Sequence, residues 1–231
     1  KGVINLRNSI SSETDHVKNQ KETLIYLLEK AKHTEFGKHY EFSKVLDSEN
    51  PYKEFKSTIP YFSYEKIQNE WWYKLHEGKD DVTWPGHPNY FALSSGTTGK
   101  TSKRIPVTDD MIEAIKNAGI KQVLAMENFK LPADFFEKEI MMLGSSTNLE
   151  KNNNHVEGEI SGISASRIPF WFRGFYKPGE EISKIDDWDE RVQKIAENAK
   201  NWDIGALSGI PSWMELMMEK VIDYHKVDNI H

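Results

Sequence analysis

One short segment of the chain combines glycines, hydroxyl side chains and a lysine in a spacing suited to binding phosphate. Residues 94–101 read Ser-Ser-Gly-Thr-Thr-Gly-Lys-Thr, one residue away from the pattern G-x-x-x-x-G-K-[ST], because a serine replaces the first glycine. Glycines let successive backbone N–H groups turn toward one anion, and hydroxyls donate further hydrogen bonds. We therefore expect a phosphate site here, with a surface hairpin of small residues as the structural alternative. The candidate residues are Ser94, Ser95, Gly96, Thr97, Thr98, Gly99, Lys100 and Thr101.

The basic residues beside this segment stand out because the chain as a whole is acidic. The 231 residues carry a formal net charge of −6, yet Lys100, Lys103 and Arg104 lie in one short stretch. Nucleic-acid binding needs many clustered cations to neutralise phosphates, so an acidic chain is a poor candidate for it. We therefore expect a small phosphate-bearing ligand and no nucleic-acid partner.

The residues after the segment argue against the loop of P-loop NTPases. In that loop a helix begins at the G-K-[ST] triplet, so that its N-terminus faces the phosphates. Here Pro106 lies where it would remove a hydrogen bond of such a helix, and it biases Ile105 toward extended backbone. We expect an extended segment over residues 103–107 instead.

Strand and helix patterns alternate around the candidate loop. Apolar runs predict strands at residues 90–93, 140–143 and 204–207, besides the extended segment. Apolar periodicity and capping residues predict helices at 15–32, 63–78 and 108–126, then from Asp186 or Asp187 to Ala199, and from Pro211 onward. The pattern predicts an α/β fold with mixed or parallel strands flanked by helices. We expect residues 1–80 to form a mainly helical outer layer and residues 81–231 to form strand–loop–helix units.

Two details of this prediction concern packing. The helix over residues 108–126 should bury one apolar stripe, and residues 158–180, rich in Gly, Pro and aromatic side chains, should form extended pieces and loops. The aromatic residues at 170–176 could stack on a ligand, although packing is the favoured interpretation. The members of the stripe are Ile112, Ile115, Gly119, Val123 and Met126.

Two further patterns have a functional and a structural interpretation. Ser63 and Lys66 fit the S-x-x-K pattern of serine acyl enzymes, but the companion motifs are missing and Ser63 suits a helix N-cap better. His155, Glu157 and Glu159 alternate as metal ligands on one strand face would, but the neighbouring Asn tract and Gly158 favour a solvated loop. We assign no metal ligand.

The amino-acid composition limits the classes of protein to which the chain can belong. The chain has no cysteine, which excludes disulfides and Cys-ligated zinc, and 38% of its residues are hydrophobic, as in globular proteins. No apolar run approaches the ~18 residues that span a membrane, and residues 1–12 lack the apolar core of a secretory signal. We expect a cytoplasmic protein without a membrane partner; its oligomeric state is left open.

The candidate loop resembles the first motif, S-S-G-T-T-G, of adenylate-forming enzymes. Lys103 comes seven residues after Gly96 and Pro106 comes ten. This spacing is similar to that of the auxin-responsive Gretchen Hagen family of acyl acid amido synthetases and its bacterial relatives, whereas in acyl-CoA synthetases the lysine usually comes one residue earlier. Residues 33–37, 59–65 and 207–213 also resemble motifs of that family in the same order.

The resemblance implies a ligase that uses ATP and Mg²⁺. A carboxylic acid would be activated as an acyl-adenylate and then transferred to an amino acid or another amine. Lys103 would be the catalytic lysine, residues 94–101 would bind the phosphates, and the turn after the strand at 204–207 would line the acyl site, with a packing turn as its alternative. That turn consists of Ser208, Gly209, Ile210 and Pro211.

The chain is expected to be one incomplete N-terminal domain over residues 1–231. Family members are about twice as long, so the other nucleotide motifs and the C-terminal domain would lie outside this sequence, and the chain alone would be inactive. Two alternatives remain open: an adenylate former of the acyl-CoA ligase type, and a non-catalytic module that binds nucleotide or phosphate.

Overall fold

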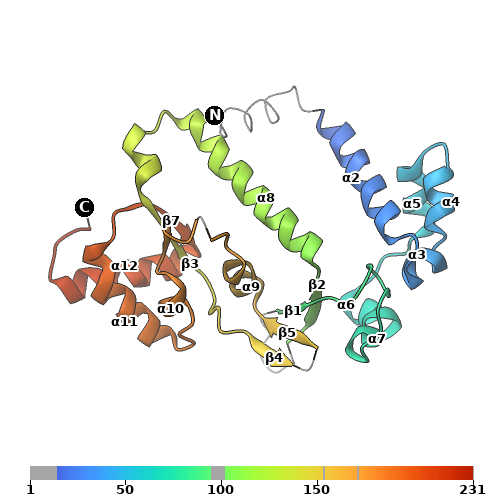
Figure 1. Ribbon diagram of the computed structural model, residues 1–231. Coiled ribbons are helices and arrows are strands. Elements are labelled where there is room, and N and C mark those ends of the chain that lie inside the picture. The colour runs from blue at the N-terminus through green and yellow to red at the C-terminus, as the bar shows by residue number, and fades with distance from the viewer. Residues whose placement is uncertain (1–14, 95–101, 153, 171, 231) are drawn as a thin grey trace. The chain divides into compact units, whose positions relative to one another are not determined.

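The computed structural model describes residues 15–94, 102–152, 154–170 and 172–230. The chain divides into two compact units, Lys1–Asn89 and Tyr90–His231, whose elements are labelled in Figure 1. Within the described residues, no helix is both long enough and apolar enough to cross a membrane.

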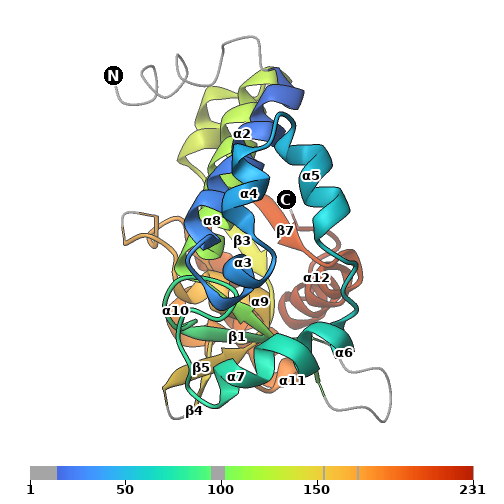
Figure 2. The ribbon, with the colours of Figure 1, turned by 90° about the vertical axis from the view of Figure 1, so that its right-hand side faces the viewer.

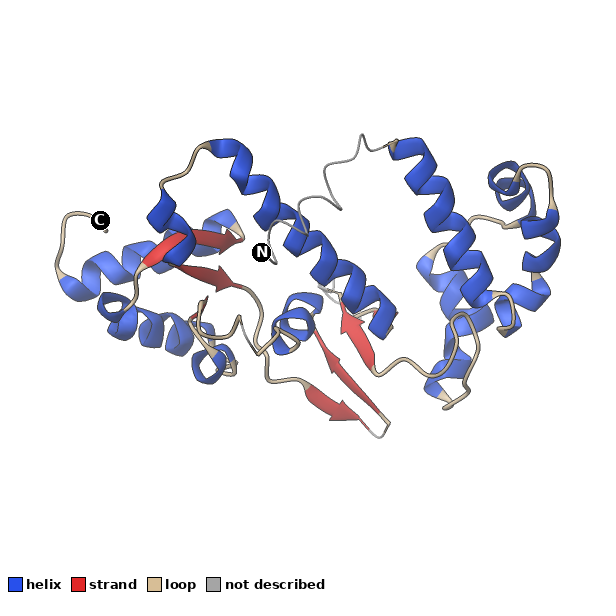
Figure 3. Ribbon diagram, turned by 45° about the horizontal axis from the view of Figure 1, so that its top comes forward, coloured by secondary structure: helices blue, strands red, loops and turns tan. Residues whose placement is uncertain are grey.

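The described residues of the first unit form helices joined by turns (Figure 3). Figures 1 and 2 both show α2, α4 and α5 side by side, and the buried side chains of Leu28, Ala31, Phe42 and Val45 form the core between them. The helices are α2 (His16–Ala31), α3 (Glu35–His39), α4 (Phe42–Asp47), α5 (Pro51–Thr58), α6 (Tyr64–Ile67) and α7 (Tyr73–His76).

Capping residues explain where several of these helices begin. Asp15 caps α2 and Ser63 caps α6, because each side chain accepts a hydrogen bond from a backbone N–H three residues later. The predicted N-cap role of Ser63 is therefore confirmed. The single helix expected over residues 63–78 is interrupted, however, by a π-helical turn at Gln68–Trp72 that separates α6 from α7.

The second unit contains two sheets, and the predicted α/β class with mixed and parallel strands is confirmed. The first sheet has the order β2-β1-β5-β4 and the second has the order β6-β3-β7. β1 is parallel to β5 and antiparallel to β2, whereas β3 is parallel to both β6 and β7. The strands are β1 (Tyr90–Leu93), β2 (Arg104–Val107), β3 (Glu139–Leu143), β4 (Glu150–Asn152), β5 (His155–Gly158), β6 (Tyr176–Lys177) and β7 (Ile204–Gly209).

Helices flank these sheets. One core cluster joins β3 to α11 and α12, with Met141, Leu143, Val192, Ile195 and Met217 among its buried residues. The α-helices of this unit are α8 (Asp109–Ala125), α9 (Ile160–Ser166), α10 (Glu180–Ser183), α11 (Trp188–Asn198) and α12 (Pro211–His225). Short 3-10 turns lie at Met126–Phe129, Ala133–Glu137 and Ala199–Asn201.

Two expectations are wrong in this unit. Residues 158–180 were expected to lack a helix, yet α9 forms there because Gly162 and Ile163 are buried by packing that overrides weak helix propensity. In α8 only Ile112 is fully buried, whereas Ile115 is 37% and Val123 is 43% exposed. The apolar stripe of α8 is therefore only partly covered.

Candidate functional site

Two of the candidate loop residues pair across the end of a hairpin. β1 and β2 form the hairpin, and Leu93 lies opposite Arg104 in the register. The backbone N–H of Ser94 donates to the carbonyl of Lys103 at 3.0 Å, and the N–H of Lys103 donates to Ser94 Oγ at 3.3 Å. Lys103 therefore lies directly before β2, and this strand, Arg104–Val107, confirms the extended segment predicted from Pro106.

The position of β2 explains how a proline fits in a strand. β2 is an edge strand of its sheet, so Pro106 can occupy it although it has no N–H to donate. The other candidate phosphate-binding residues lie outside the described residues. They are Ser95, Gly96, Thr97, Thr98, Gly99, Lys100 and Thr101.

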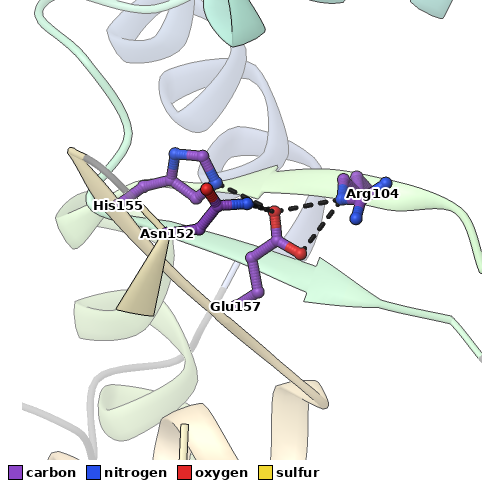
Figure 4. A network of polar contacts seen from close by, with 4 residues as sticks. All are labelled: Arg104, Asn152, His155 and Glu157. Atoms are coloured by element: carbon purple, nitrogen blue, oxygen red, sulfur yellow. Dashed lines mark hydrogen bonds and ion pairs between the residues drawn. The ribbon is translucent and has the colours of Figure 1, made fainter. Parts of the chain in front are cut away.

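A buried carboxylate holds the start of β2. Figure 4 shows Glu157 of β5 between Arg104 of β2 and His155, so that the contact passes over β1, which lies between the two strands. Arg104 Nε donates to both carboxylate oxygens at 3.0 Å, and His155 Nε2 lies 2.9 Å from Oε1. Asn152 Nδ2 lies 3.4 Å from the same oxygen. Glu157 thus joins three strands of the sheet through its side chain.

The electrostatics of Glu157 fit an ion-pair partner and not a proton donor. Glu157 is only 3% exposed, and this burial by itself would raise the pKa of its carboxyl group. Hydrogen bonds from His155 and Arg104 outweigh burial and hold the pKa of Glu157 below its ordinary value. The carboxylate is therefore ionised at neutral pH, and it fixes the residue next to Lys103.

The solvated loop expected around His155 and Glu157 is wrong. Both residues lie in β5, because Glu157 gains charge-assisted hydrogen bonds there that compensate for its burial. Glu159 instead precedes α9 and accepts a hydrogen bond from Ser145. Among the residues that the structure describes, no group of three His, Asp or Glu side chains could hold a metal ion.

A cleft lies where parallel strands of the second sheet end. It encloses ≈ 570 Å³, and its walls include Leu143 at the end of β3 with the following Gly144 and Ser145, then Ser208 and Gly209 of β7, and Ser161 and Ala165 of α9. The partly covered stripe of α8 forms another wall through Ile112, Ile115 and Gly119. In open α/β sheets, ligands bind in crevices beyond the carboxyl ends of such strands. The exposed apolar side chains of α8 therefore border a cavity that a ligand could fill.

Only part of the turn predicted to line the acyl site, residues 208–211, borders this cleft. Ser208 and Gly209 line it, whereas Ile210 precedes α12 and is 50% exposed, and Pro211 is the first residue of that helix. Gly209 lies opposite Leu143, and a Cβ at this glycine would come within 2.6 Å of the Leu143 carbonyl oxygen. The close approach of β7 and β3 therefore requires glycine at the rim of the cleft.

Hydrogen bonds connect the strand ends of the two sheets. The N–H of Ser145, just after β3, donates to Ser161 Oγ in α9 at 3.2 Å. Ser145 Oγ also contacts the carboxylate of Glu159, which directly follows β5. Because β5 is parallel to β1, these contacts bring the carboxyl end of the first sheet next to the cleft.

The sequence interpretation missed Arg191, a buried cation in the cleft wall. Arg191 of α11 is 5% exposed, and its Nε has no hydrogen-bond partner among the described residues. It lies one helical turn after Trp188, on the same face as Val192 and Ile195. A charged residue on the apolar face of a predicted helix was the available signal.

The aromatic segment at 170–176 has two kinds of environment. Phe170 is 81% exposed, whereas Tyr176 is buried in the cleft wall, with its hydroxyl 2.8 Å from Ser183 Oγ. Arg173 pairs with the carboxylate of Glu180 at 3.7 Å. Packing therefore accounts for Tyr176 but not for Phe170.

Comparison with known proteins places this arrangement in a family. Residues 7–197 match the family model described as the GH3 family N-terminal domain. Among curated protein sequences, none matches the chain. The fold is similar to that of a GH3.15 acyl acid amido synthetase, with a TM-score of 0.71 and 17% identity over 91% of this chain and 37% of that chain.

A second solved structure gives the same result. It is AtGH3.15 acyl acid amido synthetase in complex with 2,4-DB, with a TM-score of 0.68 and 17% identity over 96% of this chain and 38% of that chain. This chain therefore spans a little more than a third of the length of these two structures. At such identity the likeness shows the fold.

Proposed function

We propose that this chain, which belongs to the GH3 family, is part of an enzyme that activates a carboxylic acid with ATP and transfers the acyl group to an amino acid or another amine. The observation that best supports this proposal is the pairing of Ser94 with Lys103. It puts Lys103 in extended backbone beside the Gly/Ser/Thr segment, where the ammonium group can reach a bound phosphate.

The reaction would proceed in two displacements. A carboxylate oxygen of the acid attacks the α-phosphorus of ATP, and pyrophosphate leaves. The amine nitrogen then attacks the acyl carbon, AMP leaves, and the nitrogen loses a proton to give the amide. In the first step Lys103 would stabilise negative charge on the phosphates, while the backbone N–H groups and hydroxyls of residues 94–101 hold them in line for attack.

The network around Glu157 supports this role of Lys103. Arg104 is anchored to a buried carboxylate on one face of the sheet, so the neighbouring residue, Lys103, is held at the start of β2. Side chains alternate between the two faces of a strand, so we expect the side chain of Lys103, directly before β2, to lie on the face opposite Glu157. Arg104 and Glu157 are therefore positioning residues in the proposed site.

The cleft between α8, α9 and the ends of β3 and β7 is the proposed acyl site. Its apolar walls suit the hydrocarbon part of an acid, and Ser208 and Gly209 border it directly. We assign Ile210 and Pro211 to the proposed site only as the turn that carries Gly209 into α12. The complex of the similar synthetase with 2,4-DB supports an acyl acid as the kind of ligand.

Mg²⁺ would neutralise phosphate charge when it binds together with ATP. The described residues include no group of three His, Asp or Glu that could hold a metal, so we assign no Mg²⁺ ligand to this chain. Because the chain spans just over a third of the similar structures, we propose that it is an incomplete N-terminal domain. The remaining nucleotide contacts and a C-terminal domain would come from elsewhere in the protein, and the chain alone would be inactive.

Exchange of labelled pyrophosphate into ATP tests the first step. With the full-length protein that contains this chain, exchange should depend on an added carboxylic acid, and Lys103→Ala should lower its rate about a hundredfold. Lys151→Ala is the matched control, because Lys151 lies exposed in β4 of the same sheet and should leave the rate unchanged. An undiminished rate in Lys103→Ala would remove Lys103 from the proposed site.

The choice of acceptor separates the alternatives. An amide synthetase should form amides with amino acids or other amines, whereas an acyl-CoA ligase should form a thioester with coenzyme A. A non-catalytic module should bind ATP saturably without any pyrophosphate exchange. Formation of a thioester with coenzyme A, without amide formation with any amine, would replace the amido synthetase proposal with the ligase alternative.

A further inference from the structure

Arg191 is the one cationic side chain in the described core, and the proposed reaction gives it no task. It is 5% exposed in the cleft wall. Two other cationic side chains line the same cleft, but Lys116 pairs with Glu113 at 3.4 Å and Arg167 pairs with Asp109 at 3.7 Å. A buried guanidinium is costly unless anions or hydrogen-bond acceptors surround it. Its Nε nevertheless lacks a hydrogen-bond partner among the described residues.

The neighbouring carboxylates are engaged with other groups. Asp186 and Glu159 are near enough to favour the charged form of Arg191. Asp186, however, accepts a hydrogen bond from Asn148 Nδ2 at 2.7 Å, and Glu159 accepts one from Ser145. The ring of Trp188 lies 5.4 Å from the guanidinium, and Tyr176 also acts on its charge. Burial lowers the pKa of Arg191, and the nearby Tyr176, Asp186 and Glu159 oppose this effect.

Hydrogen-bonding groups lie in the same wall of the cleft. The hydroxyl of Tyr176 lies 2.8 Å from Ser183 Oγ, and both residues line the cleft with Arg191. Burial raises the pKa of Tyr176, so the phenol stays protonated and can donate a hydrogen bond. Arg191, Tyr176 and Ser183 therefore form a set of donors in a largely apolar cavity.

This donor set lies on the side of the cleft formed by the second sheet. Arg191 belongs to α11, which packs on β3, whereas Ser94 and Lys103 close the hairpin of the first sheet. An acid whose reacting carboxylate faces Lys103 would point its other end toward the second sheet. In the proposed binding mode, one carboxylate would not serve both cations, because they belong to different sheets.

We infer that the acid bound in this cleft carries a second anionic group, and that Arg191 pairs with it while one hydroxyl of the Tyr176–Ser183 pair donates a hydrogen bond to it. The substrate class would be dicarboxylic acids or acids with an equivalent anionic substituent. The inference rests on the proposed acyl-binding role of the cleft. An Arg–carboxylate pair can form two parallel hydrogen bonds, which would discriminate strongly against an acid that ends in a methyl group.

Ligand binding to the full-length protein tests this inference without requiring catalysis. The probes are adipate, suberate and sebacate, each compared by calorimetry with the monocarboxylate of the same carbon number, namely hexanoate, octanoate and decanoate. At neutral pH the wild type should bind at least one diacid about tenfold or more tightly than its monoacid partner. Arg191→Met should abolish this preference and retain binding of the monoacid.

A control variant and a folding measurement accompany the binding assay. Lys194→Met removes an exposed cation from the same helix, where it pairs with Glu197, and should keep the diacid preference. Arg191→Met should fold with an undiminished melting temperature, because replacing an unpaired buried cation by a hydrocarbon side chain removes a desolvation cost.

Each remaining outcome overturns a defined statement. Equal affinity of the wild type for both classes of acid, or a diacid preference that persists in Arg191→Met, overturns the inference alone. Equal loss of both classes in Arg191→Met also overturns it, because Arg191 would then bind the single carboxylate of a monoacid. Failure of every acid to bind overturns both the inference and the acyl role of the cleft. A diacid preference without pyrophosphate exchange leaves the inference standing and overturns the proposed activity.

Discussion

Replacing Glu157 by Gln should destabilise the second unit without changing the volume of the side chain. The substitution removes the charge that accepts two 3.0 Å bonds from Arg104 and one 2.9 Å contact from His155. The glutamine also places an N–H₂ donor next to the N–H donors of Arg104 or His155, where no hydrogen bond can form. Hydrogen bonds to a charged group contribute about 1.5–3 kcal/mol each, and breaking a fully buried pair costs about 3–5 kcal/mol.

The exposure of Arg104 reduces the expected cost. The Arg104 side chain is 48% exposed, so water can solvate the guanidinium when its partner is lost. We therefore expect Glu157→Gln to lower the free energy of unfolding by about 2–3 kcal/mol at pH 7, below the range for a fully buried pair. Urea titration followed by circular dichroism measures this change, and hydrogen exchange at the amides of β5 localises it.

The pH dependence gives this prediction a second, independent signature. The pKa of Glu157 is lowered in the folded state, so its contribution is fully present above the unfolded-state pKa of about 4.3. It is lost as the pH falls through the lower folded-state pKa. The difference in unfolding free energy between wild type and Glu157→Gln should therefore be constant above about pH 5 and shrink in more acidic solution.

A matched substitution provides the control for Glu157. Glu150 of β4 lies opposite Glu157 in the register and is exposed, so Glu150→Gln should change the unfolding free energy by less than about 0.5 kcal/mol. Equal stability of wild type and Glu157→Gln at pH 7 would refute the reasoning. So would a difference between them that does not change from pH 7 to pH 3.

Two further stability predictions concern the buried cap of α3 and the close packing of α9. Thr34→Ala removes a hydroxyl that caps α3, at a residue that is only 1% exposed. The substitution should lower the free energy of unfolding, measured by urea titration, by about 1–2 kcal/mol. A loss below experimental error would contradict the capping role. Gly162→Ala would put a Cβ 2.2 Å from the Ser146 carbonyl oxygen and should cost about 1–3 kcal/mol, seen as a lower melting temperature. Its control is Gly119→Ala in α8, where a Cβ meets no atom within 4 Å and should add up to about 1 kcal/mol of stability. A gain of stability in both variants would show that helix propensity and not packing decides.

Local chemistry explains why several elements could be predicted from the sequence. Thr108 and Asp187 cap α8 and α11 as expected, because capping depends on residues a few positions apart. Pro106 likewise predicted an extended segment, since its ring acts on its own backbone and on the preceding residue. These signals require no knowledge of distant parts of the chain.

The features that were missed depend on contacts between distant segments. β5 became a strand because Glu157 finds Arg104 more than fifty residues earlier, and a polar sequence gives no local sign of such a partner. α9 forms where Gly162 packs against the segment after β3. The resemblance to a known family predicted the candidate loop, but no local rule predicted that a buried Arg191 would line the cleft.

The walls of the cleft differ in how strongly the fold constrains them, and this affects how the shape of the cavity can change between related proteins. The strand ends at the rim are constrained by backbone, as the close approach of Gly209 to Leu143 shows, whereas the α8 wall consists of side chains that are only partly buried. Substitutions at Ile115 or Gly119 can therefore change the size of the cavity at little cost to folding. If the cleft binds the acid as proposed, single changes in one helix could admit new acids while the hairpin and the strand ends stay fixed.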